Sequence, residues 1–346
     1  MSMNDKISKV TILDIARELN ITAATVSRAL NDHPGIKDTT KKAVRETATR
    51  LNYKHNRIAA SLRLGKSNIV GVIIPSAEIN FFGSVVHGIE KVANENNYTV
   101  LIYQSNELYE YEKKGVQTFL QSRVDGVLAS ISKETINLDH YSEIRNRGIP
   151  LVLFDRVDDK LGVSSVVVDD FAGAYQATSH LIAHGCKRIA HIAGQQHVNI
   201  FNLRLKGYIE ALNVHGIPVN EDLIVHGKVS IDSGRECMKQ LLDRRAPMDA
   251  VFAVEDFTAL GAIQAIKAAG LKIPEDVAII GFANEAFGEY LTPSLSTVNQ
   301  QTVTMGEEAA RLLFEGLRSG EAFHANPRKL VLKPQIICRE SSLKYR

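Results

Sequence analysis

The stretch VTILDIARELNITAATVSRALN, residues 10–31, decides the fold of the N-terminal part of the chain. Its apolar residues fall at helical spacing in two short runs with a brief interruption between them. Thr11 is placed to cap the first predicted helix, with Asp14 as the acidic half of a capping box, and Thr22 is placed to cap the second. Two short helices joined by a tight turn are typical of a helix-turn-helix.

The second of these helices has a slim outer face. Its apolar residues Val26 and Ala29 are expected to point inward, which leaves small and polar residues outside: Ala23, Ala24, Thr25, Ser27 and Arg28. A recognition helix needs such a face because it lies in the major groove, where alanine methyls contact thymine and arginine reaches guanine acceptors. With a third helix predicted at about 39–52, a plain three-helix bundle without DNA binding is the alternative.

The charge of the chain is unevenly distributed. The whole chain of 346 residues carries only +2, but residues 1–66 hold 13 Lys/Arg and 6 Asp/Glu, a net charge of +7, and the remainder carries −5. A basic head on a mildly acidic body favours a polyanionic partner for the head alone. A solvated basic face is the alternative interpretation.

The composition is that of a globular protein, with 45% hydrophobic and 23% charged residues, and the length favours two or three domains. The first residues contain no apolar signal segment, and the apolar runs are far shorter than the ~20 residues of a membrane span. These features predict a cytoplasmic protein without a membrane partner. The three cysteines, Cys186, Cys237 and Cys338, are too far apart for a disulfide framework or zinc site and are predicted to be buried thiols.

The body, residues 67–346, alternates apolar β-branched runs with helical stretches. The predicted strands are 69–74, 98–103, 124–131, 150–154, 164–168, 188–194, 249–254 and 277–283. The predicted helices are 83–97, 107–122, 170–185, 203–215, 232–245, 256–270 and 303–319. Continuous rather than alternating hydrophobicity predicts parallel sheets covered on both faces, and eight strands over this length favour two α/β subdomains.

Residues 10–31, followed by LNYKHNRIAASLR at 51–63, closely resemble the headpiece of the LacI/GalR family of bacterial transcription regulators, and the resemblance extends over essentially the whole chain. It implies an α/β protein with an all-α helix-turn-helix headpiece and a two-subdomain body of the type I periplasmic-binding-protein fold. The implied boundaries are 1–54 for the headpiece, 55–66 for the hinge helix and linker, and 67–346 for the effector-binding and dimerisation domain. Within that domain the resemblance implies one subdomain of about 67–166 and 299–327 and a second of 167–298 and 328–346.

By that resemblance, Ala23, Ala24 and Arg28 contact bases, and a further group contacts phosphates: Thr11, Thr22, Thr25, Ser27 and Asn31. The hinge helix would supply Asn56, Arg57, Ala59 and Leu62, with Leu62 as an apolar wedge that kinks the duplex from the minor groove. The hinge is short and basic, so we expect it to be a marginal helix without DNA. Packing of Leu62 back on the headpiece is the alternative.

Polar and aromatic residues that directly follow predicted strands are candidates for a ligand cleft, because such clefts lie beyond the carboxyl ends of parallel strands. The set that also matches the effector pocket of the family is Phe81, Phe82, Asp155, Arg204, Glu255 and Gln300. A carboxylate and a guanidinium that face each other, beside an aromatic wall, suit a sugar-like ligand. The plain alternatives are core packing for the phenylalanines, a loop cap for Asp155 and a surface ion pair for Arg204.

One position departs from the family. Gly281-Phe282 is followed by Ala283 where an Asp is common, so we expect Asn284 to take the ligand-binding role, with Glu285 as the alternative. A solvated loop position is the plain interpretation of Glu285. His191, within a predicted strand, is expected to be a core histidine, whereas His197 could reach the rim of the cleft.

Enzyme signatures are weak. Gly65-Lys66-Ser67 ends like a phosphate-binding loop, but Ala60 stands where that loop needs glycine. Asp169-Asp170 begin a predicted helix, where capping explains both acids. We therefore expect no catalytic site, no cofactor and no metal. A solute-binding protein with the same body is the alternative to a regulator, although a basic head and the lack of an export signal weigh against it.

The sequence as a whole predicts a sequence-specific DNA-binding transcription regulator, expected to be a repressor. Its operator affinity would be controlled by a small molecule in the cleft, for which a sugar or sugar derivative is favoured. Two headpieces on a pseudopalindromic operator require a homodimer. The last apolar segment, KLVLKPQIICRESSLKYR, contains no leucine heptads, which favours a dimer over a tetramer.

Overall fold

The computed structural model describes residues 10–53, 66–244 and 247–344. The chain divides into a head unit, residues 1–67, and a body unit, residues 68–346. The predicted hinge residues Asn56, Arg57, Ala59 and Leu62 lie outside the described residues.

The described residues of the head unit, 10–53, form three short helices, α1 (Ile12–Glu18), α2 (Ala23–Leu30) and α3 (Asp38–Arg50). The Asp14 carboxylate accepts hydrogen bonds from the backbone N–H and the hydroxyl of Thr11, at 2.8 and 2.7 Å. The Thr22 hydroxyl accepts from the backbone N–H of Thr25 at 3.2 Å. Both predicted helix starts are therefore confirmed, and the helices close over a small core that includes Ile15, Val26 and Val44.

The body unit contains two parallel sheets, which define lobe one and lobe two. The sheet of lobe one has the order β11-β5-β4-β3-β1-β2 and is formed by Ile69–Ile74 (β1), Thr99–Gln104 (β2), Gly126–Ala129 (β3), Leu151–Phe154 (β4), Ser164–Val168 (β5) and Lys329–Leu332 (β11). The sheet of lobe two has the order β7-β6-β8-β9 and is formed by Ile189–Ala193 (β6), Ile224–His226 (β7), Ala250–Ala253 (β8) and Ala278–Ile280 (β9). The eight predicted strands are all confirmed.

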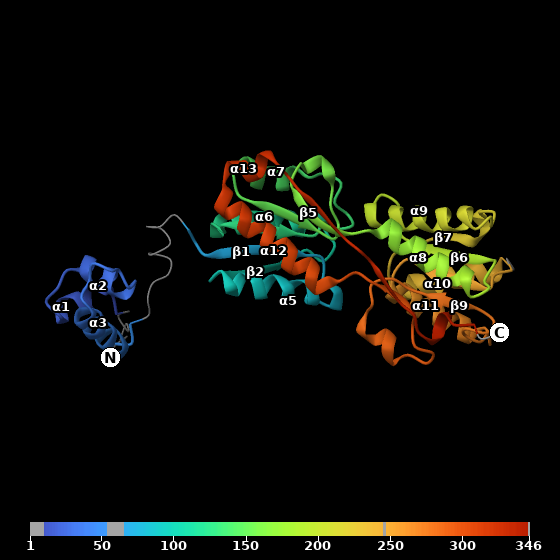
Figure 1. Ribbon diagram of the computed structural model, residues 1–346, viewed down its shortest axis with the longest axis horizontal. Helices are drawn as coiled ribbons and strands as arrows, with labels where there is room; N and C mark the ends of the chain where they lie inside the picture. The colour runs from blue at the N-terminus through green and yellow to red at the C-terminus, as the bar shows by residue number, and fades with distance from the viewer. Residues whose placement is uncertain (1–9, 54–65, 245–246, 345–346) are drawn as a thin grey trace, which may run out of the picture. The chain divides into compact units, whose positions relative to one another are not determined.

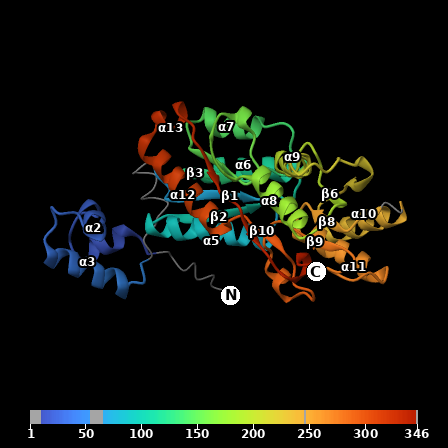
Figure 2. The ribbon, with the colours of Figure 1, turned by 45° about the vertical axis from the view of Figure 1, so that its right-hand side comes forward.

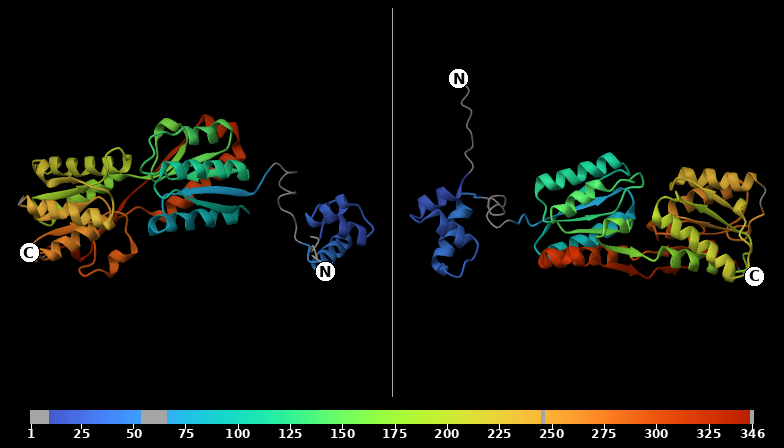
Figure 3. Two further views of the ribbon diagram at one scale, coloured as in Figure 1. Left: turned by 180° about the vertical axis from the view of Figure 1, so that it is seen from behind. Right: turned by 90° about the horizontal axis from the view of Figure 1, so that it is seen from above.

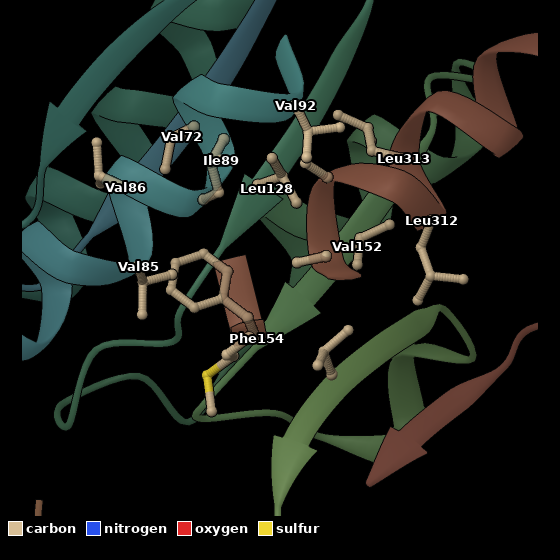
Figure 4. Packing of buried hydrophobic residues seen from close by; sticks show 14 of the residues in the cluster. Val72, Val85, Val86, Ile89, Val92, Leu128, Val152, Phe154, Leu312 and Leu313 are labelled. Atoms are coloured by element: carbon tan, nitrogen blue, oxygen red, sulfur yellow. The ribbon is translucent and has the colours of Figure 1, made fainter. Parts of the chain in front are cut away.

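Helices cover both faces of each sheet (Figures 1 and 3). In lobe one, Asn80–Glu95 (α5) and Thr302–Ser319 (α12) pack on one face, and Tyr109–Ser122 (α6) and Asp139–Asn146 (α7) pack on the other. Successive strand residues alternate between the two cores: Val72 contacts the α5–α12 side, seen in Figure 4, and Ile73 contacts the α6–α7 side. Continuous apolar runs thus follow from sheets that are buried on both faces.

Lobe two follows the same plan, with Asp170–Ala183 (α8) and Asn199–Val214 (α9) on one face and Ile231–Asp243 (α10) and Asp256–Ala268 (α11) on the other. His191 lies in its core, stacked between the rings of Phe252 and Tyr208, and its Nδ1 is 2.9 Å from the carbonyl oxygen of Phe252. Burial lowers the pKa of His191 to about 4, so the ring is neutral at pH 7. The expectation of a core histidine is confirmed.

The chain passes between the lobes three times, after β5, before α12 and after β11. The third passage differs from the expected boundary at 328. Lys329–Leu332 pair with β5 in lobe one, so the crossing comes later, at about 333. Beyond it, Gln335–Ile337 (β12) pairs antiparallel with Thr297–Asn299 (β10) and ties the second and third crossings together.

Several short elements were not predicted. They are α7, Glu321–Ala325 (α13), the three- and four-residue strands β7, β10, β11 and β12, and the 3-10 helices Asp159–Leu161, Glu221–Leu223, Ala286–Tyr290 and Glu340–Ser342. The cysteine prediction was partly wrong, because Cys186 and Cys237 are buried but Cys338, just after β12, is exposed.

Glycines bring the paired helices of the body unit into backbone contact. Helices α5 and α12 lie side by side (Figure 2), and a Cβ at Gly88 would lie 2.2 Å from the carbonyl oxygen of Val303. The same close approach occurs at Gly207 between α9 and α8 and at Gly261 between α11 and α10. A side chain at any of these three positions would clash with the backbone of the neighbouring helix, so each helix pair depends on its glycine for this close packing.

We expect Gly88→Ala to destabilise the body unit by about 2 kcal/mol, because the added methyl must displace backbone. Gly83→Ala in the same helix is the matched control, since a Cβ there meets nothing within 4 Å. The control should raise stability by up to about 1 kcal/mol through helix propensity. Urea unfolding of both variants measures the difference, and equal stabilities would contradict close packing at Gly88.

Candidate functional site: a helix face and an interlobe cleft

The outer face of α2 is open to solvent as predicted. Thr22, Ala24, Arg28 and Asn31 are exposed, and Ala23, Thr25 and Ser27 are partly exposed. Thr11, at the start of α1, is also exposed. The Asn31 side chain donates to the backbone carbonyl of Ser27 at 2.8 Å and so closes the C-terminal end of α2.

Arg28 differs from neighbouring basic residues of the head unit. Arg17 pairs with Asp14, Arg45 with Asp32 and Arg50 with Glu18. Within the described residues, no carboxylate lies within ion-pair distance of Arg28. Its guanidinium can therefore form bidentate hydrogen bonds with an acceptor outside this chain.

The second site is a cavity of about 70 Å³ in the body unit, called here the cleft cavity. Its walls contain six of the seven residues predicted to bind ligand, which are Phe81, Phe82, Asp155, Arg204, Glu255 and Gln300. The remaining lining residues are Ile79, Lys133, Arg156, Ile200, Phe201, Val229, Phe257, Ala283 and Glu285. The cleft thus collects residues from both lobes.

Arg204, on α9, is almost fully buried and highly connected. Its Nε and Nη2 lie 2.8 and 2.7 Å from one carboxylate oxygen of Asp170, and Nη1 donates to the carbonyl of Val254 at 2.8 Å. The guanidinium also lies 3.7 Å from the centroid of the Phe282 ring and 3.3 Å, through Nη2, from Oε1 of Gln300. One Nη1 proton remains for a ligand.

The partner of Arg204 corrects the capping interpretation of the acidic pair at the start of α8. Asp169 caps the helix, since its Oδ1 accepts from the backbone N–H of Ala172 at 2.9 Å. Asp170 instead points into the core and pairs with Arg204. Asp169 precedes the first turn of α8 and Asp170 is its first residue, so the two side chains leave the helix end in different directions. The surface ion pair considered for Arg204 is likewise wrong.

Asp155 follows β4 with a left-handed backbone, φ +59°, which is uncommon for residues other than glycine, asparagine and aspartate. Its Oδ2 accepts from the hydroxyl of Ser130 at 3.2 Å and lies 3.8 Å from Nε of Arg156. Burial raises the pKa of Asp155, although Arg156 and Arg204 oppose the shift. Strained backbone at the end of a strand is a recurrent feature of ligand sites.

The phenylalanine pair has both roles that the sequence left open. Phe81 and Phe82 belong to the core of lobe one and also line the cleft cavity. Their rings are edge-to-face, with centroids 5.0 Å apart. Phe82 additionally lies 5.7 Å from the guanidinium of Arg156.

Asn284, predicted to bind ligand, does not line the cleft cavity, whereas its alternative, Glu285, does. Left-handed backbone at Asn284, φ +55°, directs its side chain to Arg339, whose Nη2 donates to Asn284 Oδ1 at 3.1 Å. Glu285 is only 3% exposed, and its Oε1 accepts from the backbone N–H of Phe81 at 3.3 Å. This hydrogen bond crosses the cleft from lobe two to lobe one.

Glu255 caps α11, since its Oε2 accepts from the backbone N–H of Phe257 at 3.0 Å. Burial, reinforced by Asp256 and Glu285, raises the pKa of Glu255 to about 8. Burial also raises the pKa of Glu285 to about 6. Both carboxyl groups therefore ionise at a higher pH than an ordinary glutamate does.

Two basic lining residues were missed. Lys133 and Arg156 both pair with Glu107, at 3.3 and 2.7 Å. The signal was present, because Lys133 lies two residues beyond a predicted strand and Arg156 directly follows Asp155. Lys133 also lines a wider cavity of about 750 Å³, together with His197, whose Nε2 is 2.8 Å from the Lys133 carbonyl oxygen.

Among the described residues, no group of three or more His, Cys, Asp or Glu side chains is arranged to hold a metal ion. The helices in the same part of the chain are all too short or too polar to cross a bilayer.

Comparison with known proteins finds matches for the head unit and for the body unit. Residues 11–56 match the model of bacterial regulatory proteins of the lacI family, and residues 178–342 match that of the periplasmic binding protein-like domain. The chain is 33% identical to the HTH-type transcriptional regulator DegA of Bacillus subtilis, over 96% of this chain and 98% of that protein. It is 34% identical to catabolite control protein A of Priestia megaterium, over 88% and 91%.

The fold agrees with solved structures. A complex of the transcriptional regulator CelR with cellobiose superposes with a TM-score of 0.73 at 30% identity, covering 96% of this chain and 99% of that one. The predicted fold class, a helical headpiece and an α/β body with parallel sheets, is confirmed.

The raised pKa of Glu255 makes the folding stability of the protein depend on pH. As the pH rises from about 4.5 to about 8, the unfolded chain releases this proton while the folded chain retains it, so Glu255 makes the protein progressively less stable. We expect Glu255→Gln to be more stable than the parent at pH 8, by on the order of 2 kcal/mol, and equal to it near pH 4.5.

Urea unfolding at several pH values tests this expectation. Exposed Glu289, four residues beyond Glu285, supplies the control Glu289→Gln, which should follow the parent at every pH. A constant difference between Glu255→Gln and the parent across the range would contradict the assigned shift.

Proposed function

The chain belongs to the LacI family of bacterial regulatory proteins, and we propose that it is a repressor whose operator affinity is set by a small molecule bound in the cleft cavity. It is a transcription regulator, as its relatives are. The observation that carries the proposal is the presence, in one chain, of an exposed α2 face and of a body cleft lined by six predicted ligand-binding residues. No catalytic role is proposed, and a regulator of genes would act in the cytoplasm.

The proposed DNA interface is the exposed face of α2. Ala23, Ala24 and Arg28 would contact base edges, with Arg28 donating to guanine, and the neighbouring hydroxyls and Asn31 would bind phosphates. One helix reads only a few base pairs, so we propose that a homodimer binds a pseudopalindrome. The net charge of +7 on residues 1–66 supports a DNA partner for this part of the chain.

The proposed effector is a carbohydrate or carbohydrate derivative. Asp155, Glu255 and Glu285 provide hydrogen-bond acceptors, Arg204 provides a donor, and Phe81 offers an apolar wall. The relative CelR, which forms a complex with cellobiose, supports this ligand class.

The proposed mechanism is a shift in the arrangement of the lobes. Hydrogen bonds from Phe81 N–H to Glu285 and from His197 to the Lys133 carbonyl hold the cleft edges together. The free volume of about 70 Å³ is far below the roughly 300–1,000 Å³ of typical ligand pockets, so an effector must separate these contacts. Operator DNA and effector would then select different lobe arrangements.

We expect Arg28→Ala to lower the affinity for the selected operator by about 1–3 kcal/mol and to relax specificity at one base pair of each half-site. Selection from a randomised DNA pool, followed by titration, measures both effects. Lys42→Ala removes the same charge from the outer side of α3 and should leave the selected sequence unchanged. An identical sequence preference for Arg28→Ala and the parent would exclude Arg28 as a base-reading residue.

We expect a carbohydrate that raises the Tm of the full chain to change operator affinity by roughly 5–150-fold, and operator DNA to change carbohydrate affinity by the same factor. Titrations of each ligand with and without the other measure this reciprocity. Asp155→Asn should weaken carbohydrate binding with operator binding intact, because asparagine tolerates the same φ. Exposed Asp159→Asn is its control. Independent binding of the two ligands would refute the mechanism.

A further inference from the structure

The charges around the cleft cavity do not balance. Its three cations pair with two acids that do not line the cavity, Arg204 with Asp170 and both Lys133 and Arg156 with Glu107, and Arg156 also lies 3.8 Å from Asp155. Three carboxyl groups, Asp155, Glu255 and Glu285, do line it. Asp256, behind them, is bonded to the Thr297 hydroxyl and the Glu285 backbone N–H. The surplus charge at the cavity is therefore negative.

Glu255 and Glu285 form the uncompensated part of this surplus. Within the described residues, neither has a cation within ion-pair distance, and Lys133 and Arg204 act on Glu255 only from farther away. Each uses one carboxyl oxygen to accept a backbone N–H, from Phe257 and from Phe81 respectively. The second oxygen of each has no hydrogen-bond partner among the described residues, although Glu285 is 97% buried (3% exposed).

This arrangement discriminates between ligand charges. Carboxyl groups that are shielded from water and lack a counter-charge are unfavourable in the ionised state, so a ligand that brings a positive charge lowers the cost of ionising Glu255 and Glu285. A phosphate or carboxylate would add to the surplus, and the cations near it each face an acid already, which leaves single N–H groups on Nη1 of Arg204 and Nε of Arg156 to receive it. A neutral hydroxyl group would form hydrogen bonds with the second carboxyl oxygens of Glu255 and Glu285 but would not compensate their negative charge.

The aromatic residues of the cavity agree with a cationic ligand. Phe81, Phe201 and Phe257 line the same space as the two glutamates. Aromatic faces attract cations as well as covering apolar ring faces. The cavity therefore combines carboxylate oxygens for an ammonium group with surfaces for the ring that carries it.

We propose that the effector is an amino sugar, and that its protonated amine lies between Glu255 and Glu285. This proposal rests on the function proposed above and narrows its ligand class. It also gives Glu285 the position left open by Ala283, as a residue that determines ligand charge.

The experiment compares three matched sets of probes with the full chain at pH 7. Glucosamine, galactosamine and mannosamine are each titrated beside the corresponding hexose and hexuronate, by thermal shift and calorimetry. We expect at least one hexosamine to bind at least tenfold more tightly than its hexose, and no hexuronate to bind.

Variants assign the preference to the two carboxylates. Glu255→Gln and Glu285→Gln keep the acceptor for the backbone N–H and should each reduce the hexosamine affinity about tenfold, towards that of the hexose. Glu289→Gln, on the exposed surface nearby, should bind like the parent. Circular dichroism of each variant checks that the fold is intact. If one variant does not fold, the other variant alone tests whether the hexosamine preference depends on these carboxylates.

Three results would overturn the proposal: binding of a hexuronate, a hexose that binds as tightly as its hexosamine, or the lack of binding by all three hexosamines. A preference that survives both glutamine variants would also overturn it. None of these results refutes the regulatory function, which is tested separately by operator selection. Failure of the chain to select any operator would refute the regulatory function whatever the probes do.

Discussion

The ion pair between Arg204 and Asp170 fixes the geometry of the cleft, and the other features of the cleft depend on it. The guanidinium joins α9 to the start of α8, to the end of β8 and to the crossover at Gln300. A buried pair of this kind adds little net stability over apolar packing, but loss of one partner leaves the other charged and unpaired. The pair instead serves to hold groups in place. The Arg204 side chain lines the cleft cavity and also contacts Gln300 at the crossover between the lobes.

Two other acidic residues of the cleft differ from this pair because they have no charged partner among the described residues. Arg204 and Asp170 satisfy each other, whereas Glu255 and Glu285 hold acceptor oxygens that nothing in the described chain occupies. A site that keeps such groups is less stable than a filled core would be, and strain at Asp155 adds to that cost. Proteins commonly show this conflict between local stability and ligand binding at functional positions.

The sequence predicts the larger elements well and the finer geometry less well. Long apolar runs and an intact capping pattern identify the strands, the helices of the head unit and most of the cleft wall. Strands of three residues such as β7 carry too few side chains for a period to appear. The roles of Asp169 and Asp170 depend on which of two neighbouring carboxylates faces the core, and Asn284 turns away because of a left-handed backbone. Tertiary packing decides where these side chains point, and the spacing of residue types along the sequence does not reveal it.

The glycines at the helix crossings have a mechanical consequence. Backbones in direct contact at Gly88, Gly207 and Gly261 leave no compressible side chains between the paired helices. Close backbone packing of this kind favours movement of each lobe as one rigid body over deformation within the lobe. Strand β1 begins at Ile69, at the start of the body unit, and lies second from one edge of the sheet of lobe one, between β3 and β2. In the mechanism proposed above, a change in the angle between the lobes would therefore move the start of β1 together with the rest of its lobe.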